Sequence, residues 1–159
     1  MNIKIICLGK VKETSLSNLI DEYKKRISKY ANIEIIELQD EPLPNNPSKK
    51  DILNIKKVEA TRIKSKIHPS DFVVCLDQYG KQLTSEELSD KIQDITVKGF
   101  STIDFIIGGT TGLEKEFVAN SNLVLSFSKL TFPHQLIRLF LSEQIFRAFK
   151  IMNNERYHW

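Results

Sequence analysis

The chain has 159 residues, of which 41% are hydrophobic and 27% charged, and its formal net charge is +3. This length is close to the ~150 residues of one ordinary domain, and the composition excludes a disordered chain, collagen and a small disulfide scaffold. No apolar run approaches the ~20 residues that cross a bilayer, and Lys4 interrupts the first apolar segment, so we expect no membrane segment and no signal peptide.

The spacing of apolar residues alternates between strand and helix along the chain. Strands are expected at residues 3–8, 33–38, 72–77, 103–107 and 123–127. Helices are expected at residues 16–30, 48–67, 84–97, 113–118 and 133–152, and a proline-rich loop at 39–47. Ser48 is the expected N-cap of the second helix, and Thr84 with Glu87 forms a capping-box pattern. The alternation predicts a single α/β domain over residues 1–159, with a mostly parallel sheet and helices on both faces.

The last expected helix carries too many apolar residues for one face. They are Leu136, Ile137, Leu139, Phe140, Leu141, Ile145, Phe146, Phe149 and Ile151. A helix that is apolar nearly all round must be covered on more than one side. Either a central place in the domain or a second subunit provides that cover. We favour a second subunit, because a terminal helix usually lies outside the sheet and a two-fold homodimer is the commonest assembly.

Cysteine, histidine and lysine indicate little about chemistry on their own. Cys7 and Cys75 lie in apolar segments without CxxC spacing, so we expect reduced core thiols in a cytoplasmic protein. The three histidines are scattered singly, which predicts no metal site. A charge of +3 is compatible with RNA binding but does not predict it. The lysines within 24–26 and 49–66 are expected to be mostly solvated, with some binding phosphates if the substrate is RNA.

The ends of the expected strands are the best place for a ligand. In an open parallel sheet, ligands bind at the carboxyl ends of the strands, here at residues 76–77, 107–109 and 127–129. The GGxxG spacing of Gly108, Gly109 and Gly112 makes either a tight turn or a place where a ligand approaches the backbone. It is neither a Walker loop nor the dinucleotide fingerprint GxGxxG.

The segment 126–134 also allows two interpretations. It is either a capped helix start with Thr131 as the N-cap, or a pocket lined by the free N–H groups of a helix N-terminus. The pattern alone does not decide between them.

Several motifs combine into a specific pattern that covers the chain essentially end to end. They are Leu8-Gly9-Lys10, Phe105-Ile106-Ile107-Gly108-Gly109, Gly112-Leu113, the run from Leu125 to Gln135, Arg138, Glu143-Gln144, Arg147-Ala148 and Tyr157-His158. This pattern closely resembles the RlmH family, bacterial SPOUT-class methyltransferases that act on N3 of a pseudouridine in 23S rRNA of the large ribosomal subunit. The resemblance implies a trefoil knot in the C-terminal part, an exception to unknotted folds, and a homodimer packed through it.

The resemblance also implies the co-substrate and the site. The co-substrate is S-adenosyl-L-methionine, with no metal, and its matching binding residues are Leu76, Gly108, Phe127, Ser128, Lys129, Leu130, Thr131 and Phe132. Candidate catalytic residues, which would take the N3 proton or stabilise the enolate oxygens, are His158 and Tyr157 of the partner's tail. Candidate RNA contacts are Arg138, Arg156 and His134. We expect the substrate to be the assembled ribosome.

Three alternatives remain open at particular residues. His134 is also a candidate base or a helix-entry residue, and Arg138 can instead form a core ion pair. Family tails carry a basic residue after Tyr-His, whereas this chain has Trp159. Either Arg156 replaces that phosphate contact, or Trp159 stacks on an exposed base.

Two other functions fit parts of the pattern. One is a different methylation of the same class, such as that of tRNA, which the C-terminal motifs disfavour. The other is a non-catalytic α/β module that binds a small nucleotide or a ribosomal partner, for which productive binding of S-adenosyl-L-methionine is not expected.

Overall fold

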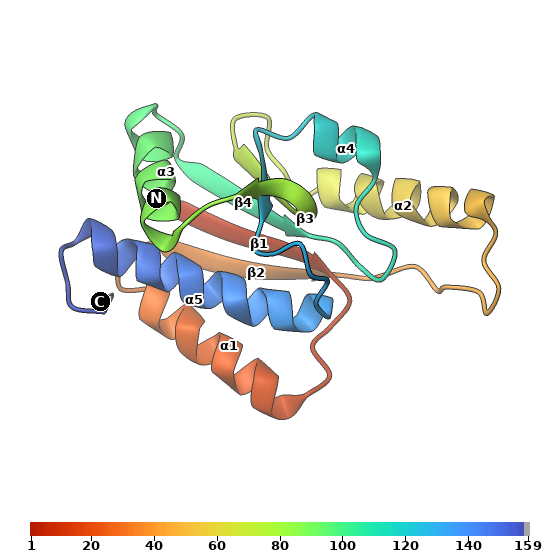
Figure 1. Ribbon diagram of the computed structural model, residues 1–159, viewed down its shortest axis with the longest axis horizontal. Coiled ribbons are helices and arrows are strands. Elements are labelled where there is room, and N and C mark those ends of the chain that lie inside the picture. The colour runs from red at the N-terminus through yellow and green to blue at the C-terminus, as the bar shows by residue number, and fades with distance from the viewer. Residues whose placement is uncertain (158–159) are drawn as a thin grey trace.

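The computed structural model describes residues 1–157, in which five strands alternate with five helices (Figure 1). The strands are β1 (Asn2–Leu8), β2 (Asn32–Leu38), β3 (Phe72–Gln82), β4 (Thr102–Ile107) and β5 (Leu123–Ser126). The helices are α1 (Thr14–Ile27), α2 (Lys49–Lys64), α3 (Ser85–Val97), α4 (Lys115–Ala119) and α5 (His134–Met152). Each expected element is present. The predicted α/β fold is confirmed, and the trefoil knot stays a prediction.

The sheet has the strand order β2-β1-β4-β3-β5, and all of its pairings are parallel. All six residues of β4 are buried at its centre. Helices α1, α3 and α5 cover one face, and α2 and α4 cover the other (Figure 1). Since every strand runs the same way, the loops after β3, β4 and β5 meet at one edge of the sheet.

Two helices begin with capping boxes, of which the sequence predicts the one at Thr84 in full and, at Ser48, the N-cap residue. Ser48 accepts a hydrogen bond from the backbone N–H of Asp51 at 3.1 Å, and Asp51 accepts one from the Ser48 N–H at 2.8 Å. Thr84 and Glu87 repeat this exchange at the start of α3. Each pair satisfies two donors that a helix N-terminus leaves free.

Strand β3 is longer than the sequence predicts, and it is interrupted. Leu76 and Lys81 both pair with Leu125 of β5, so residues 77–80 form an excursion outside the ladder. Gly80 ends the excursion against β5, where a Cβ atom would lie 2.7 Å from the backbone carbon and oxygen of Val124. No real side chain fits at that distance, so this approach of the two strands requires glycine.

Helix α5 begins later than predicted and is largely covered by its own chain. The prediction that Thr131 is the N-cap is wrong, because Pro133 holds the N-cap position and α5 starts at His134. Proline has a fixed φ and no N–H, which suits it to a helix start. Between the sheet, α1 and α3, the helix buries Leu141, Ser142 and Ala148 completely.

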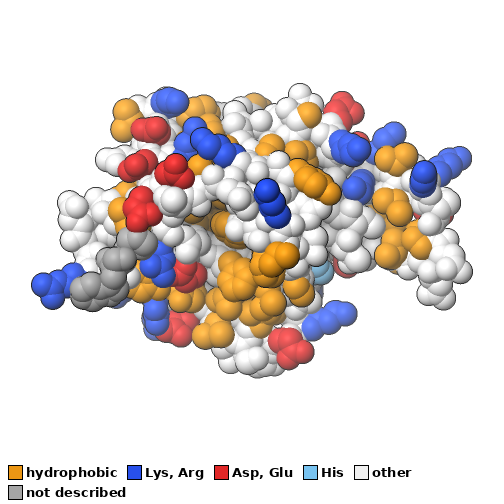
Figure 2. Space-filling view, in the orientation of Figure 1, with side chains coloured by type: hydrophobic (Ala, Val, Ile, Leu, Met, Phe, Trp, Pro, Cys, Tyr) orange, Lys and Arg blue, Asp and Glu red, His pale blue; other side chains and the backbone are white. Residues whose placement is uncertain are grey.

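A strip of apolar side chains on the outer side of α5 and the preceding loop remains exposed, and Figure 2 shows hydrophobic side chains gathered there. It consists of Leu130, Phe132, Leu136 and Phe140, with exposures of 70%, 38%, 37% and 39%. The rings of Phe132 and Phe140 pack edge to face at 5.7 Å. Packing within the chain therefore buries or partly buries most of the apolar side chains of α5. We call the four side chains that remain exposed on this side the α5 strip.

Candidate functional site

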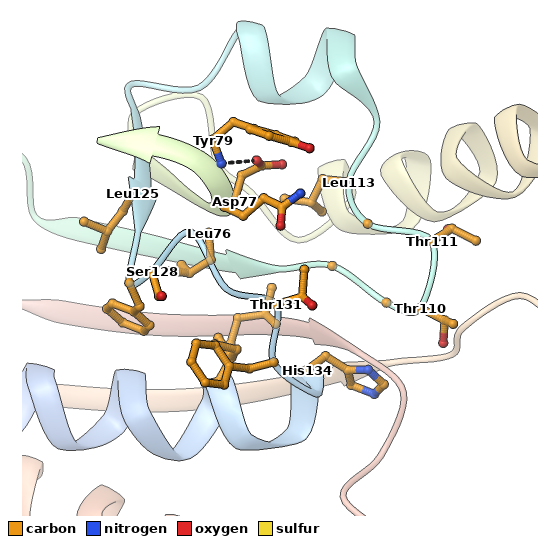
Figure 3. A pocket seen from close by; sticks show the side chains of 18 of the residues that line it. Leu76, Asp77, Tyr79, Thr110, Thr111, Leu113, Leu125, Ser128, Thr131 and His134 are labelled. Atoms are coloured by element: carbon orange, nitrogen blue, oxygen red, sulfur yellow. Dashed lines mark hydrogen bonds between the residues drawn. The ribbon is translucent and has the colours of Figure 1, made fainter. Parts of the chain in front are cut away.

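A cavity of about 430 Å³ lies at the carboxyl ends of β3, β4 and β5 (Figure 3). Its walls come from the β3 excursion, the loop 108–112 after β4, and the segment from β5 into the first turn of α5. Small-molecule pockets have volumes of roughly 300–1,000 Å³ and occur at this edge of open parallel sheets. The cavity is therefore the candidate ligand site, at the strand ends where the sequence places it.

Seven of the eight residues expected to bind the co-substrate line this cavity. They are Leu76, Gly108, Phe127, Ser128, Leu130, Thr131 and Phe132. Lys129, the eighth, is exposed and is not part of the lining. The fold thus brings together three segments that lie far apart in the sequence, around one space.

The glycine loop after β4 closes tightly on itself. A Cβ atom on Gly108 would lie 3.0 Å from the backbone nitrogen of Leu113 and 3.1 Å from the carbonyl carbon of Gly112. Gly112 has a φ of +76°, which favours glycine. The GGxxG segment is therefore a tight turn, and because its glycines also line the cavity, the approach of a ligand to this backbone stays a prediction. A bulky residue at 108 would displace the loop itself, so it cannot isolate a contact with a ligand.

The β3 excursion adds a carboxylate and an aromatic ring to the cavity. The Asp77 Oδ1 atom accepts a hydrogen bond from the backbone N–H of Tyr79 at 2.9 Å, which closes a short turn. Both residues line the cavity, and Tyr79 is 89% exposed at its rim (Figure 3). Tyr79 was not expected at the site, because the apolar run that predicts this strand ends at Asp77 and only the pairing with β5 reveals the excursion.

His134 lines the cavity at the start of α5. Burial lowers the pKa of His134, and the charges of Arg138 and Lys12 lower it further, whereas Asp40 opposes them. The imidazole is therefore mainly neutral at pH 7 and retains one nitrogen that can accept a proton.

The Arg138 side chain is enclosed within its own chain. Its side chain is 1% exposed, and its guanidinium donates hydrogen bonds to the backbone oxygens of Leu8 and Gly9 at 2.8 and 2.6 Å. It also forms an ion pair with Glu37 at 2.7 Å. The structure therefore contains the buried ion pair of the second interpretation, and an RNA contact through Arg138 stays a prediction.

Tyr157 follows α5 in the sequence, and its side chain packs back against the middle of that helix. Its hydroxyl donates to Glu143 at 3.1 Å, and the Arg147 guanidinium stacks on its ring at 4.8 Å. Burial raises the pKa of Tyr157, as do its hydrogen bonds with Tyr23 and Glu143. Glu143 lies nine residues beyond His134, roughly 14 Å along α5, and Tyr157 is not part of the cavity lining.

The other expected residues belong to the C-terminal tail of the chain. Arg156 is exposed beside Tyr157. His158, the other expected catalytic residue, lies outside the described residues, as does Trp159.

Neither a metal-ligating group nor a membrane-spanning helix is found in the described part of the chain. Within residues 1–157, no group of three or more histidine, cysteine, aspartate or glutamate side chains is arranged to hold a metal ion. None of the helices in that range is long and apolar enough to span a membrane.

Comparison with known proteins places the chain in a family. A family model described as "Predicted SPOUT methyltransferase" matches residues 1–158. The ribosomal RNA large subunit methyltransferase H of Clostridium novyi (strain NT) is 51% identical over 158 residues, which are 99% of each chain. The putative ribosomal RNA large subunit methyltransferase H of Methanococcus maripaludis (strain C5 / ATCC BAA-1333) is 50% identical over the same shares.

Solved structures support the fold. A probable methylase family protein from Haemophilus influenzae Rd KW20 is similar with a TM-score of 0.53, over 99% of this chain and 70% of that one, at 12% identity. A putative methylase family protein from Neisseria gonorrhoeae has a TM-score of 0.51, over 91% and 81% of the two chains, at 13% identity. With the family model and the close relatives, these findings show that the chain belongs to the SPOUT methyltransferase family, among the RlmH relatives that its motifs resemble.

Proposed function

We propose that the protein transfers a methyl group from S-adenosyl-L-methionine to N3 of a pseudouridine in 23S rRNA, on assembled ribosomes in the cytoplasm. Family membership supports the reaction class, and relatives about 50% identical along 99% of the chain are named for large-subunit rRNA. The structural observation that carries the proposal is the cavity at the ends of β3, β4 and β5. Its lining contains seven of the eight residues that the family resemblance assigns to the methyl donor.

The lining fits the chemistry of this donor. Leu76, Leu113 and Leu125 offer apolar surface for a flat adenine. The Asp77 carboxylate supplies a negative charge for a positively charged sulfonium or ammonium group. The donor provides an activated methyl group, so the residues of the chain have to bind it, orient it toward the acceptor and exclude water.

Replacing Asp77 by asparagine tests this charge. The oxygen of the new amide can still accept the hydrogen bond from the Tyr79 N–H, so the excursion keeps its shape while the negative charge is lost. Because a hydrogen bond or contact to a charged group contributes about 1.5–3 kcal/mol, we expect the affinity for S-adenosyl-L-methionine to fall roughly tenfold or more. Titration calorimetry measures it, with Asp90→Asn on α3 as the control. An unchanged affinity would remove Asp77 from the donor site.

The acceptor chemistry assigns different tasks to the candidate residues. N3 of a pseudouridine must lose its proton as the new N–C bond forms, so a neutral base near the cavity is required. His134 is mainly neutral and lines the cavity, and His158 of the partner subunit is the other candidate base. The raised pKa of Tyr157 keeps its hydroxyl protonated, which suits a donor rather than a base.

A second copy of the chain is the proposed cover of the α5 strip. The strip adjoins the cavity, since Leu130 and Phe132 belong to both. A two-fold dimer through this strip would let the tail of one chain approach the cavity of the other, whose lining within a single chain does not include Tyr157.

A charge in the α5 strip is expected to separate the subunits. Phe140→Glu places a carboxylate where an apolar ring would be buried between two chains, which costs several kcal/mol per dimer. Sedimentation analysis should then show a monomer, whereas the wild type and Leu53→Glu, an exposed leucine on α2, should both remain dimers. A Phe140→Glu protein that is still a dimer would place the interface elsewhere.

The proposed reaction has a direct test. Ribosomes from a strain that lacks this modification are incubated with the protein and isotope-labelled S-adenosyl-L-methionine, and the rRNA nucleosides are analysed by mass spectrometry. Labelled 3-methylpseudouridine in 23S rRNA is the expected product. Label on another nucleoside, or in tRNA offered in parallel, would reject the proposed substrate, and donor binding without any transfer would favour the non-catalytic module.

A further inference from the structure

One side of the cavity carries a lysine whose ammonium group has no partner among residues 1–157. Lys56 of α2 lines the cavity, and its Nζ atom lies 3.9 Å from the position that a Cβ atom would take on Gly112. In the chain from residue 1 to 157, Lys56 takes part in no ion pair and no side-chain hydrogen bond. Arg62, further along the same helix, is paired with Glu41. The ammonium group of Lys56 is therefore available to a ligand.

The loop beside Lys56 adds donors that are also unused. Thr111 lines the cavity, and its Oγ1 atom is buried without a hydrogen-bond partner among the described residues. Within that same part of the chain, the backbone N–H groups of residues 109–111 have no partner either, while Gly112 donates to the Gly109 oxygen at 3.1 Å. Successive free N–H groups, a hydroxyl and a lysine are the donors that bind an oxyanion.

The charges at the two ends of the cavity have opposite signs. Asp77 and Tyr79 lie together on one side, and Thr110 and Thr111 lie on the other, nearer to His134 (Figure 3). Near His134, Asp40 and Lys12 shift its pKa in opposite directions, so these two charges oppose each other on that side. The carboxyl of Glu59 is buried and is not part of the lining. Its Oε1 atom lies 3.6 Å from the position that a Cβ atom would take on Gly109, and it accepts a hydrogen bond from the Glu41 N–H. One end therefore suits a cation and the other suits an anion.

We propose that Lys56, Thr111 and the N–H groups of residues 109–111 bind a phosphate of the substrate RNA beside the target nucleotide. The inference rests on the proposed function. A base that enters this cavity brings the flanking phosphates of its strand to the rim, and a contact with one of them fixes the position of the strand without reading its sequence. The carboxylate of the methyl donor has the same anionic chemistry, so the experiment must separate the two ligands.

The experiment measures the binding of two ligands by four proteins. The proteins are the wild type, Lys56→Met, Thr111→Val, and the control Lys57→Met, whose lysine is the next residue of α2 but is exposed and does not line the cavity. Ribosomes that lack the modification are titrated by co-sedimentation at several salt concentrations. S-adenosyl-L-methionine is titrated by calorimetry.

Loss of one phosphate contact has a characteristic signature. For Lys56→Met we expect roughly tenfold weaker ribosome binding at low salt, and a slope of log affinity against log salt that is smaller by about 0.7–0.9. Thr111→Val should weaken binding less and leave the slope unchanged, because it removes no charge. The affinity for the methyl donor should stay within about twofold of wild type in both variants, and Lys57→Met should resemble the wild type in both titrations.

Two results would overturn the inference. In one, Lys56→Met binds ribosomes with the affinity and salt slope of the wild type. In the other, Lys56→Met loses affinity for the methyl donor while its salt slope for ribosomes is unchanged, which would assign the anion site to the donor's carboxylate. If the wild type methylates no RNA, the proposed function fails, yet the ribosome titration still decides whether Lys56 contacts phosphate.

Discussion

Replacing Arg138 by methionine is expected to lower the free energy of unfolding by about 3–5 kcal/mol. The substitution leaves the backbone oxygens of Leu8 and Gly9 buried without their donors, and it leaves Glu37 without its counter-ion. Removing one partner of a buried charged pair is costly because the remaining groups cannot recover their hydration. Urea unfolding at a fixed protein concentration measures the loss.

Arg26→Met is the matched control for Arg138. Arg26 forms an exposed pair with Glu22 one turn away on α1, and such surface pairs contribute less than about 1 kcal/mol. An Arg138→Met protein that unfolds like the wild type but binds ribosomes weakly would show that Arg138 contacts RNA after all, and that its burial in a single chain is misleading.

Gly80→Ala is expected to damage the cavity and the sheet together. The new methyl group would lie 2.7 Å from the Val124 carbonyl and 2.8 Å from the carbonyl carbon of Leu125, and both are backbone atoms of β5. Strand β5 or the β3 excursion must therefore move, which costs about 1–3 kcal/mol of stability. Because Asp77, Tyr79 and Leu125 all line the cavity, we also expect the affinity for S-adenosyl-L-methionine to fall more than tenfold.

Gly99→Ala separates the effect of a close approach from that of changing a glycine. Gly99 has a φ of +90° but nothing within 4 Å of its Cβ position, and it lies between α3 and β4, away from the cavity. The Gly99→Ala variant should lose roughly 1–2 kcal/mol of its free energy of unfolding to backbone strain and bind the methyl donor with the affinity of the wild type. Thermal unfolding and calorimetry compare the two variants. Equal donor affinity in both would show that the excursion has no role in the site.

The sequence predicted those parts of the fold that depend on local patterns. The five strands and five helices follow from apolar spacing, the cap at Ser48 follows from its residue type, and the capping box at Thr84 follows from Glu87 three residues later. The second half of β3 has no such pattern, because Lys81 and Gln82 are held only by pairing with β5. Thr131 was a reasonable cap by residue type, but Pro133 determines where the helix begins.

The site was predictable to the extent that it follows strand ends. Gly108 and the segment 127–132 come directly after buried strands, so their place at one edge follows from a parallel sheet. Lys56 lines the cavity from α2 and comes more than 50 residues before the loop 108–112. It resembles the other lysines of α2, so no local signal distinguishes it. The contacts of Arg138 likewise could not be predicted from a local pattern, since its partners Leu8 and Gly9 lie 130 and 129 positions away.

The strand order has a consequence for how quickly the protein folds. Strand β1 pairs with β4, and the side chains of Asn2 and Thr102 that meet across this pairing are 100 positions apart. Folding rates fall as contacts join more distant parts of a chain, since the entropy of closing such a loop is lost before the contact forms. Arg138 then joins the end of β1 to α5 across a still longer loop. We therefore expect refolding on the slow scale of milliseconds to seconds typical of non-local topologies, with the cavity among the last features to form.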